Sequence, residues 1–168
     1  MDKMVFVVRK AEYEDIPQLK EVAREAFRLY AEGAGIAEIV GTLEETHEDL
    51  EKEINNKLVL VAEADGQIVG SVRVEIKADK TAYLSRFGVL GTYQSRGIGK
   101  QLIKAVDIEM KKLGVANLYL NTASRMFSLV RFYYGLGFYI ESTTKDQGYI
   151  RALLCKEYKC EITNKLVI

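Results

Sequence analysis

The residues best suited to chemistry lie at positions 94–100, where the sequence reads Gln-Ser-Arg-Gly-Ile-Gly-Lys. They open a run from about 97 to 113 in which apolar residues recur at helical spacing. Backbone N–H groups at a helix N-terminus face outward at the positive end of the helix dipole. Gly97 and Gly99 have no Cβ, so a ligand can approach the main chain closely. The segment therefore predicts an anion site, most simply for a phosphate or pyrophosphate.

Two common phosphate-binding patterns do not fit this segment. A P-loop needs a Gly separated by four residues from the Gly-Lys pair and a Ser or Thr after it, but Gln94 and Gln101 stand there. A dinucleotide fingerprint needs a third Gly or Ala where Leu102 stands. The pattern that fits is Gln/Arg-x-x-Gly-x-Gly. In this, residues 94–99 resemble the coenzyme A pyrophosphate loop of the GNAT (Gcn5-related) N-acetyltransferases. An ordinary glycine turn is the alternative for this segment taken alone.

A second segment extends the resemblance. Residues 132–138 read Phe-Tyr-Tyr-Gly-Leu-Gly-Phe and resemble the helix-end signature of the same family, in which an aromatic residue or Leu is followed by Tyr, three residues and Gly-Phe. The two segments stand in the family's order, with one strand-like run between them. The resemblance covers about residues 4–156 and is sharpest at 81–138. The chain is thus identified as a member of the GNAT family.

The resemblance implies a mixed α/β fold, with a mostly antiparallel mixed sheet of about seven strands flanked by four helices. It also implies one domain over residues 1–168, with a core at about 4–156 and a short C-terminal tail. The order of elements read from the sequence, β-α-α-β-β-β-α-β-α-β-β, agrees with it.

The resemblance further implies an enzyme. Family members transfer an acetyl group from acetyl-CoA to a primary amine, of a small molecule or of a protein, by direct attack in a ternary complex. No carboxylate lies between Thr81 and Val89, where many members carry a Glu that acts as the base. Glu75, Glu63 or a chain of water molecules are the alternatives for this role. The missing carboxylate favours a second hypothesis, a non-catalytic acyl-CoA-binding or regulatory module.

The resemblance also suggests roles for individual residues. Tyr133 occupies the place of the tyrosine that protonates the leaving thiolate, and Tyr134, adjacent to it on a helix, is the weaker candidate. The backbone N–H of Val89 is expected to stabilise the oxyanion, and Gly88 suits a bulge in that strand. The family's frequent Asn is Met126 here, so Asn121, Thr122 or Ser128 replaces it. The predicted cofactor-binding residues are Phe87, Gly88, Val89, Gln94, Ser95, Arg96, Gly97, Ile98, Gly99, Lys100, Asn121 and Ser128.

Two helices are expected in the first third of the chain. Asp15 followed by Pro17 predicts an N-cap and a helix to about Ala31, ended by Gly-Ala-Gly at 33–35. Thr42 with Glu45 predicts a capping box that opens a second helix. That helix would place His47, the sole histidine, on its apolar face, packed structurally or contacting substrate. Its acidic run, within residues 43–54, is either a solvated face or an acidic rim for a cationic acceptor.

Strands and turns follow from the remaining patterns. Asp65-Gly66 predicts a hairpin turn between strands at 57–64 and 67–76, and a further strand ends at Val89. A strand at 117–122 precedes a helix from Ser124 to about Tyr134. Strands at 138–142 and 149–155 close the fold, and the residues after Tyr158 form a tail or an extra edge strand.

The composition sets the remaining expectations. The 168 residues include 24 Lys+Arg and 24 Asp+Glu, so no net charge directs the chain to nucleic acid or to a membrane surface. Cys155 and Cys160 form no zinc pattern and are too few for a disulfide scaffold, which predicts reduced thiols, no metal and a cytoplasmic location. No apolar run is long enough to span a bilayer. Pairing into a homodimer through C-terminal elements, common in the family, is compatible with the sequence.

Overall fold

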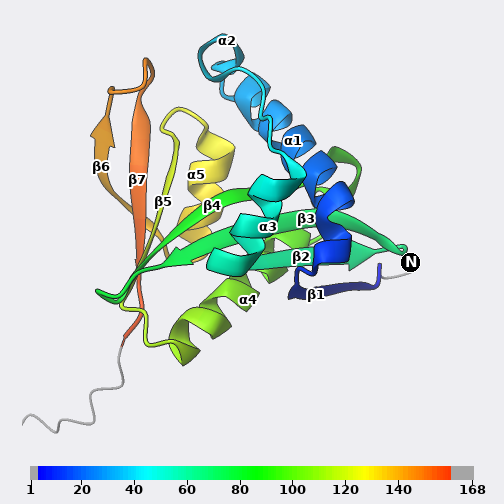
Figure 1. Ribbon diagram of the computed structural model, residues 1–168. Helices are drawn as coiled ribbons and strands as arrows, with labels where there is room; N and C mark the ends of the chain where they lie inside the picture. The colour runs from blue at the N-terminus through cyan, green and yellow to red at the C-terminus, as the bar shows by residue number, and fades with distance from the viewer. Residues whose placement is uncertain (1–3, 160–168) are drawn as a thin grey trace, which may run out of the picture.

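Seven strands form the sheet at the centre of the protein (Figure 1), seen here in a computed structural model that describes residues 4–159. The strand order across the sheet is β1-β2-β3-β4-β5-β7-β6. Neighbouring strands are antiparallel except for β4 and β5, which are parallel. The strands are β1 (Phe6–Lys10), β2 (Leu58–Ala64), β3 (Gln67–Ile76), β4 (Thr81–Val89), β5 (Asn117–Ala123), β6 (Tyr139–Thr144) and β7 (Arg151–Glu157).

Helices cover both faces of this sheet. In Figure 1, α1 and α3 lie in front of the strands and α4 lies behind them. The helices are α1 (Ile16–Gly33), α2 (Ala37–Val40), α3 (His47–Asn56), α4 (Ile98–Lys112) and α5 (Phe127–Gly135), with 3-10 turns at Tyr13–Asp15 and Gly91–Tyr93. The mixed α/β fold and the seven strands agree with the prediction, and α2, a single turn that the sequence did not suggest, makes the fifth helix.

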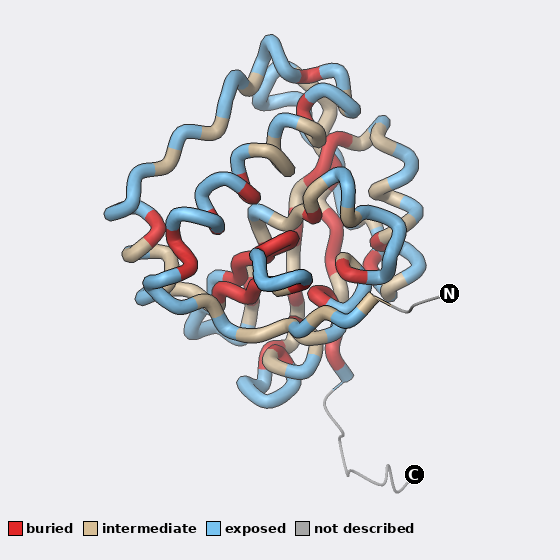
Figure 2. Tube along the Cα trace, turned by 90° about the vertical axis from the view of Figure 1, so that its right-hand side faces the viewer, coloured by how far each residue is buried: buried red, intermediate tan, exposed pale blue. Residues whose placement is uncertain are grey.

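Two apolar layers hold the helices to the sheet. The larger one packs α4 against the strands through Leu102, Ile103, Val106 and Met110, which are all fully buried. The smaller one joins α1 and α3 to the strands through Leu19, Leu50 and Val61. Figure 2 shows the buried residues gathered inside the trace while the outer turns are exposed. Burial of apolar faces on both sides fixes the sheet between the helices.

The turn at Asp65-Gly66 confirms the hairpin prediction. Both residues have positive φ, 53° and 75°, as a tight turn with right-handed twist requires. The turn brings β2 and β3 together over their whole length, with Leu58 opposite Val74 and Ala64 opposite Gln67.

The prediction for the start of the second helix was wrong. The N-cap is Thr46, whose hydroxyl accepts from Asp49 N–H while the Asp49 side chain accepts from Thr46 N–H. Glu45 cannot cap at Thr42 because its carboxylate binds Arg73, at 2.6 and 2.8 Å. The helix therefore begins at His47, whose side chain is 61% exposed and lies 3.2 Å from Glu51, so it does not belong to the apolar face.

Smaller corrections concern element ends. Asp15 is the N-cap residue of α1 and Pro17 lies in its first turn, as predicted, but the Asp15 side chain makes no capping hydrogen bond to α1; it accepts from Arg9 and from Glu12 N–H instead. The fifth helix begins at Phe127 rather than Ser124, and β6 runs from Tyr139 to Thr144. The tail predicted after Tyr158, with Cys160, lies outside the described residues except for Lys159. None of the helices within residues 4–159 is both long and apolar enough to cross a membrane.

Candidate functional site between β4 and β5

The parallel strands β4 and β5 diverge soon after they meet. Their pairing is confined to Thr81–Tyr83 opposite Asn117–Tyr119, although β4 continues to Val89 and β5 to Ala123. Figure 1 shows the two strands separating toward their C-terminal ends, with α5 behind the gap. On the edges that face the gap, the divergence leaves backbone groups of both strands without a neighbouring strand, so a ligand can pair with them there.

A bulge in β4 accompanies the divergence. The pairing with β3 shifts between Ser71 and Arg73, and Arg86 on the other strand has a positive φ of 50°. Gly88, predicted to form the bulge, is instead paired in register with Ser71. Its lack of a side chain has another cause: a Cβ at this position would overlap the methyl group of Ala26 on α1. The bulge thus changes the direction of β4 at Arg86, two residues before Gly88, where the sequence predicted it.

The backbone of Val89 faces the gap. Leu90 N–H donates to Val69 O across the β3 side at 2.8 Å. Because successive N–H groups of a strand point to opposite edges, Val89 N–H points away from β3 and toward the opening. Val89 O shares this direction and accepts a hydrogen bond from Gln94 Nε2 at 3.1 Å, which ties the end of β4 to the glycine loop.

The glycine loop has the backbone geometry of an anion site. Gly97 is the N-cap of α4 with φ of 84°, and Ser95 also has a positive φ, of 62°. Gln101 N–H donates to Gly97 O, but within residues 4–159 no backbone carbonyl accepts from the N–H groups of residues 95–100. The first turn of α4, described in full, contains no Asp or Glu. The N–H groups of the loop, the positive end of the α4 dipole and the absence of acidic residues in the first turn of α4 therefore all favour binding of an anion.

A cavity of about 540 Å³, here called the loop cavity, runs along this loop. Its walls come from α1, the end of β4, the glycine loop and α5. The predicted residues that line it are Phe87, Gly88, Val89, Gln94, Ser95, Gly97, Ile98, Gly99, Lys100 and Ser128. Phe87 and Phe132 stack in its wall with ring centroids 5.8 Å apart, and a Cβ on Gly99 would lie 3.1 Å from Phe87.

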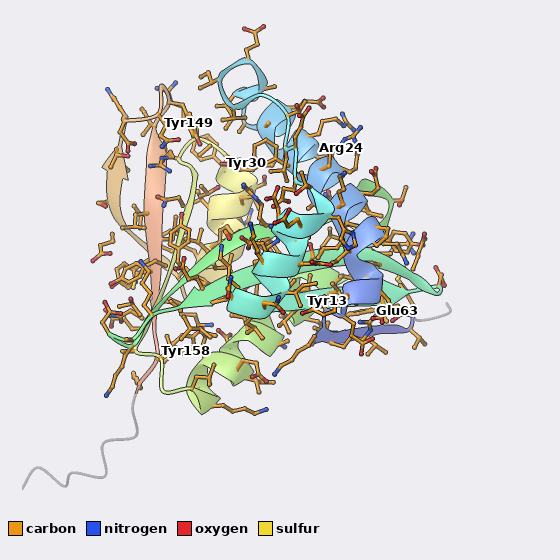
Figure 3. All side chains as sticks on the ribbon, in the orientation of Figure 1. Tyr13, Arg24, Tyr30, Glu63, Tyr149 and Tyr158 are labelled. Carbon is orange, nitrogen blue, oxygen red and sulfur yellow. The ribbon has the colours of Figure 1, made fainter. Side chains whose placement is uncertain are left out.

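A second cavity of about 510 Å³, the splay cavity, occupies the gap between β4 and β5. α1 and α2 close one side, and the turn between β6 and β7 closes another. Figure 3 labels Tyr30 on α1 and Tyr149 near that turn, both of which line it. The two cavities share four lining residues: Ala26, Tyr30, Phe87 and Leu129. They therefore meet at the bulged part of β4.

Tyr133 reaches the splay cavity from α5. Its ring is only 5% exposed and packs against Phe87 and Phe138, with centroids at 6.1 and 5.5 Å. Burial, with a smaller effect from Tyr30, raises the pKa of the Tyr133 hydroxyl well above its usual value. The hydroxyl therefore stays protonated across neutral pH and is available as a hydrogen-bond donor.

Two predicted cofactor residues do not line the loop cavity. Arg96 lies outside both cavities, with its guanidinium 5.7 Å from the Tyr93 ring. Asn121 lines the splay cavity instead and donates to Tyr83 Oη at 2.6 Å. The candidate bases Glu63 and Glu75 line neither cavity, and Glu63 is paired with Arg9 at 3.0 Å. His47 and the acidic residues of α3 line neither cavity either.

Sequence reasoning missed several residues of the splay cavity. Tyr30 on α1 accepts a hydrogen bond from Ala123 N–H at 2.8 Å, which links the helix to the end of β5 that no longer pairs with β4. Arg86, Tyr149 and Arg151 also line the cavity, and Arg86 lies far from the other two in sequence. The available sequence signal was Arg86 itself, the single charged residue within the strand-like run 81–89.

Comparison with known proteins fits this geometry. A model of the acetyltransferase (GNAT) family matches residues 17–138, which include α1, β2–β5, both signature segments and most of the two cavities. The chain belongs to the GNAT family. This acetyltransferase is 30% identical over 149 residues to a spermidine N(1)-acetyltransferase of Thermoplasma acidophilum, an alignment that covers 83% of this chain and 92% of the relative.

Solved structures agree. The PaiA N-acetyltransferase of Thermoplasma acidophilum in complex with coenzyme A is 28% identical, with a TM-score of 0.77 over 92% of this GNAT chain and 100% of that one. The ribosomal-protein-S18-alanine N-acetyltransferase of Escherichia coli, 16% identical, has a TM-score of 0.74 over 95% and 99% of the two chains, which shows a shared fold. Family and relatives establish the chain as an acetyl-CoA-dependent N-acetyltransferase.

Proposed function

We propose that this acetyltransferase binds acetyl-CoA in the loop cavity and an amine in the splay cavity, and that the amine attacks the acetyl carbonyl directly. The observation that carries the proposal is that the two cavities share walls at Phe87, beyond Tyr83, the last residue of β4 that pairs with β5. Substrates entering from the two sides would have their reacting atoms side by side, which supplies the proximity that direct transfer needs.

The residues of the loop cavity suit the pyrophosphate of coenzyme A. Among residues 4–159, no backbone carbonyl accepts from the N–H groups of Gly97, Ile98 and Gly99, and Lys100 adds a positive charge. A side chain on Gly99 would press on Phe87 and narrow the cavity. A structure similar to this chain was solved with coenzyme A, which supports the same ligand here. Unpaired backbone of β4 beyond Tyr83, at Phe87 and Val89, can pair with the extended pantetheine arm.

The Val89 N–H would serve the developing oxyanion. It points into the gap and is held there by the β4–β3 ladder on one side and by the Gln94 contact to Val89 O on the other. A donor fixed in advance stabilises negative charge on the carbonyl oxygen as nitrogen attacks, without having to reorient.

Tyr133 would serve the leaving sulfur. As the C–N bond forms, the C–S bond breaks and a thiolate departs. Since burial raises the pKa of Tyr133, its hydroxyl donates a strong hydrogen bond to that thiolate more readily than it gives up its proton outright. The proton that the nitrogen loses then reaches the sulfur through water. This fits the lining of the splay cavity, where the described residues include no carboxylate to act as base.

A covalent acetyl-enzyme is not favoured by the described residues. Cys155 is buried on β7 and lines neither cavity, and burial raises the pKa of its thiol, which lowers its thiolate content at neutral pH.

Initial-rate kinetics with both substrates varied tests the proposal. Direct transfer in a ternary complex gives intersecting double-reciprocal lines, and the protein mass stays unchanged after incubation with acetyl-CoA alone. Parallel lines together with an acetylated protein would contradict the mechanism. Saturable acetyl-CoA binding with no turnover on a broad panel of amines and peptides would instead support the alternative of a non-catalytic acyl-CoA-binding module.

A further inference from the structure

The charged residues of the splay cavity are all positive. Arg86 and Arg151 line it, from β4 and from β7, and no Asp, Glu or Lys does so in the part of the chain that the structure describes. Several tyrosines, an asparagine, a glutamine and a threonine supply the remaining polar lining. A site built for a polycation would be expected to present carboxylates, because an ammonium group that leaves water needs a counter-charge.

The two arginines have donor capacity to spare. Within residues 4–159, Arg86 has no ion-pair partner within 4 Å, and its guanidinium lies 5.7 Å from the Phe27 ring in the wall of the cavity. Arg151 binds the exposed Asp146 through Nη2 at 3.2 Å, but its Nε is buried and has no hydrogen-bond partner among the described residues. Thr122, also in the wall and 3% exposed, has a hydroxyl without a partner. Buried donors of this kind are costly unless something binds them.

The neighbouring carboxylates are already committed. Asp146 accepts from Thr144 Oγ1 at 2.7 Å as well as from Arg151. Glu45, the acid whose charge interacts with Arg86, is bound to Arg73 through both oxygens. Neither lines the cavity. The positive charge of Arg86 is therefore left to act on whatever occupies the site, whereas Arg151 shares its charge with Asp146 and offers its unpartnered Nε as a donor.

Building on the proposed function, we infer that the acceptor is a primary amine that also carries an anionic group, a carboxylate or a phosphate, bound by Arg86 and Arg151. Guanidinium groups bind both anions through paired N–H donors. The same charges disfavour a protonated amine and so help the nitrogen to become the neutral nucleophile. Aromatic walls at Phe27, Tyr30 and Tyr149 leave room for an apolar or aromatic body between the two polar ends.

This inference differs from what the relative's name and the acidic run in residues 43–54 suggest. The related protein is named for spermidine, a polycation. In this chain the acidic residues of α3 lie outside the splay cavity, so they do not form its rim.

A matched series of amines tests the inference. The series is phenylalanine, phenylalaninamide and phenethylamine, which differ at the anionic group, with phosphoethanolamine and spermidine for comparison. Thiol release measures kcat/KM for each. We expect the carboxylate or the phosphate compound to exceed its uncharged and cationic counterparts by roughly tenfold to a thousandfold, and the better of the two identifies the anion. Preference for spermidine or phenethylamine would overturn the inference while leaving the proposed acetyl transfer intact.

Variants locate the effect. Arg86→Ala and Arg151→Ala should each raise KM for the preferred anionic amine by about tenfold or more and leave KM for acetyl-CoA unchanged. Arg24→Ala, an exposed arginine of α1 that lines neither cavity (labelled in Figure 3), is the matched control and should change neither. Equal KM values in all three variants would refute the role of the two arginines.

If no amine is acetylated, calorimetric titration of the protein–coenzyme A complex with acetylated amines tests the inference instead. Binding of N-acetylphenylalanine but not of N-acetylspermidine, lost in Arg151→Ala, would support the inference. Binding of neither would count against it. Failure of the protein to bind acetyl-CoA at all would refute the proposed function itself.

Discussion

Ala26 of α1 lies directly over Gly88 of β4, so close that any Cβ on residue 88 would overlap the alanine methyl group. Ala26 lines both cavities and Gly88 lines the loop cavity. The contact therefore sets how near α1 comes to the bulged strand at the point where the two proposed substrates meet.

Gly88→Ala should increase the separation between α1 and β4, because the added methyl group would overlap that of Ala26. We expect a loss of about 1–3 kcal/mol in the free energy of unfolding, since overpacked sites cost that much, together with a lower kcat/KM. Denaturant titration and thiol-release assays measure the two effects. Adding Ala26→Gly should restore part of both, beyond its own helix penalty of about 1 kcal/mol. Gly135→Ala, where an added Cβ meets no atom within 4 Å, is the control. Additive effects of the two changes would argue against the contact.

Tyr133→Phe tests the hydroxyl at the leaving sulfur. We expect kcat to fall roughly tenfold to a thousandfold while the Kd for acetyl-CoA barely changes, because the ring packing is kept and the donor alone is lost. Tyr134→Phe makes the same change on the adjacent, half-exposed residue, whose hydroxyl accepts from Ile140 N–H outside both cavities. Normal turnover in Tyr133→Phe would remove this residue from the mechanism.

Gly97→Glu tests the pyrophosphate site. It places a carboxylate among the free N–H groups of the loop and a side chain on a residue with φ of 84°, so acetyl-CoA affinity should fall at least about a hundredfold by calorimetry. Gly114→Glu is a close control: Gly114 follows the other end of α4, has φ of 69°, and an added Cβ there meets no atom within 4 Å. Gly114→Glu should have the same cost of placing a side chain on a residue with positive φ, but it should keep the affinity for acetyl-CoA. Equal losses in the two variants would indicate a folding defect rather than a ligand site.

Glu45 and Arg73 form a buried pair that should govern stability. Arg73 is 1% exposed, and Glu45→Gln removes its closer partner and leaves only the carboxylate of Glu53, at 3.7 Å, to compensate its charge, so we expect a loss of up to about 3 kcal/mol. Glu25→Gln, which breaks an exposed pair with Arg28, should change stability little by comparison. Similar effects of the two substitutions would show that the Glu45–Arg73 pair has no special weight.

The same pair predicts a dependence on pH. Burial opposes ionisation of Glu45, but the hydrogen bonds and charge of Arg73 outweigh it, so its pKa lies below the ordinary 4.5. A lowered folded-state pKa gives stability that is present above 4.5 and is lost as pH falls below it. The difference in unfolding free energy between the native protein and Glu45→Gln should therefore narrow below that pH. A difference independent of pH would contradict the assignment.

Local patterns predicted the fold well. Alternating and helical apolar spacing, the Asp65-Gly66 turn and the paired signatures were sufficient for the sheet and for α1, α4 and α5, because those elements bury faces that the sequence itself marks. The start of α3 was misplaced because two capping boxes compete there, and the choice between them depends on Arg73, 28 residues away from Glu45.

The candidate site likewise has one part that could be predicted from local sequence and one part that could not. The glycine loop at 94–100 is contiguous in sequence, so six of its seven residues, all but Arg96, line the loop cavity. The splay cavity is assembled from α1, β4, β5, α5 and the β6–β7 turn, and nothing local brings Arg86 toward Arg151 or Tyr30 toward Ala123. The position of Asn121 was missed because its partner, Tyr83, is on the neighbouring strand.

Calorimetric titration of the protein with acetyl-CoA, followed by thiol release and product mass on the amine series, tests acetyl transfer by this chain directly. We expect micromolar binding with one site per chain and turnover on at least one amine, with the acetyl group recovered on its nitrogen. Absence of acetyl-CoA binding by the native protein would contradict the proposed cofactor site at the glycine loop.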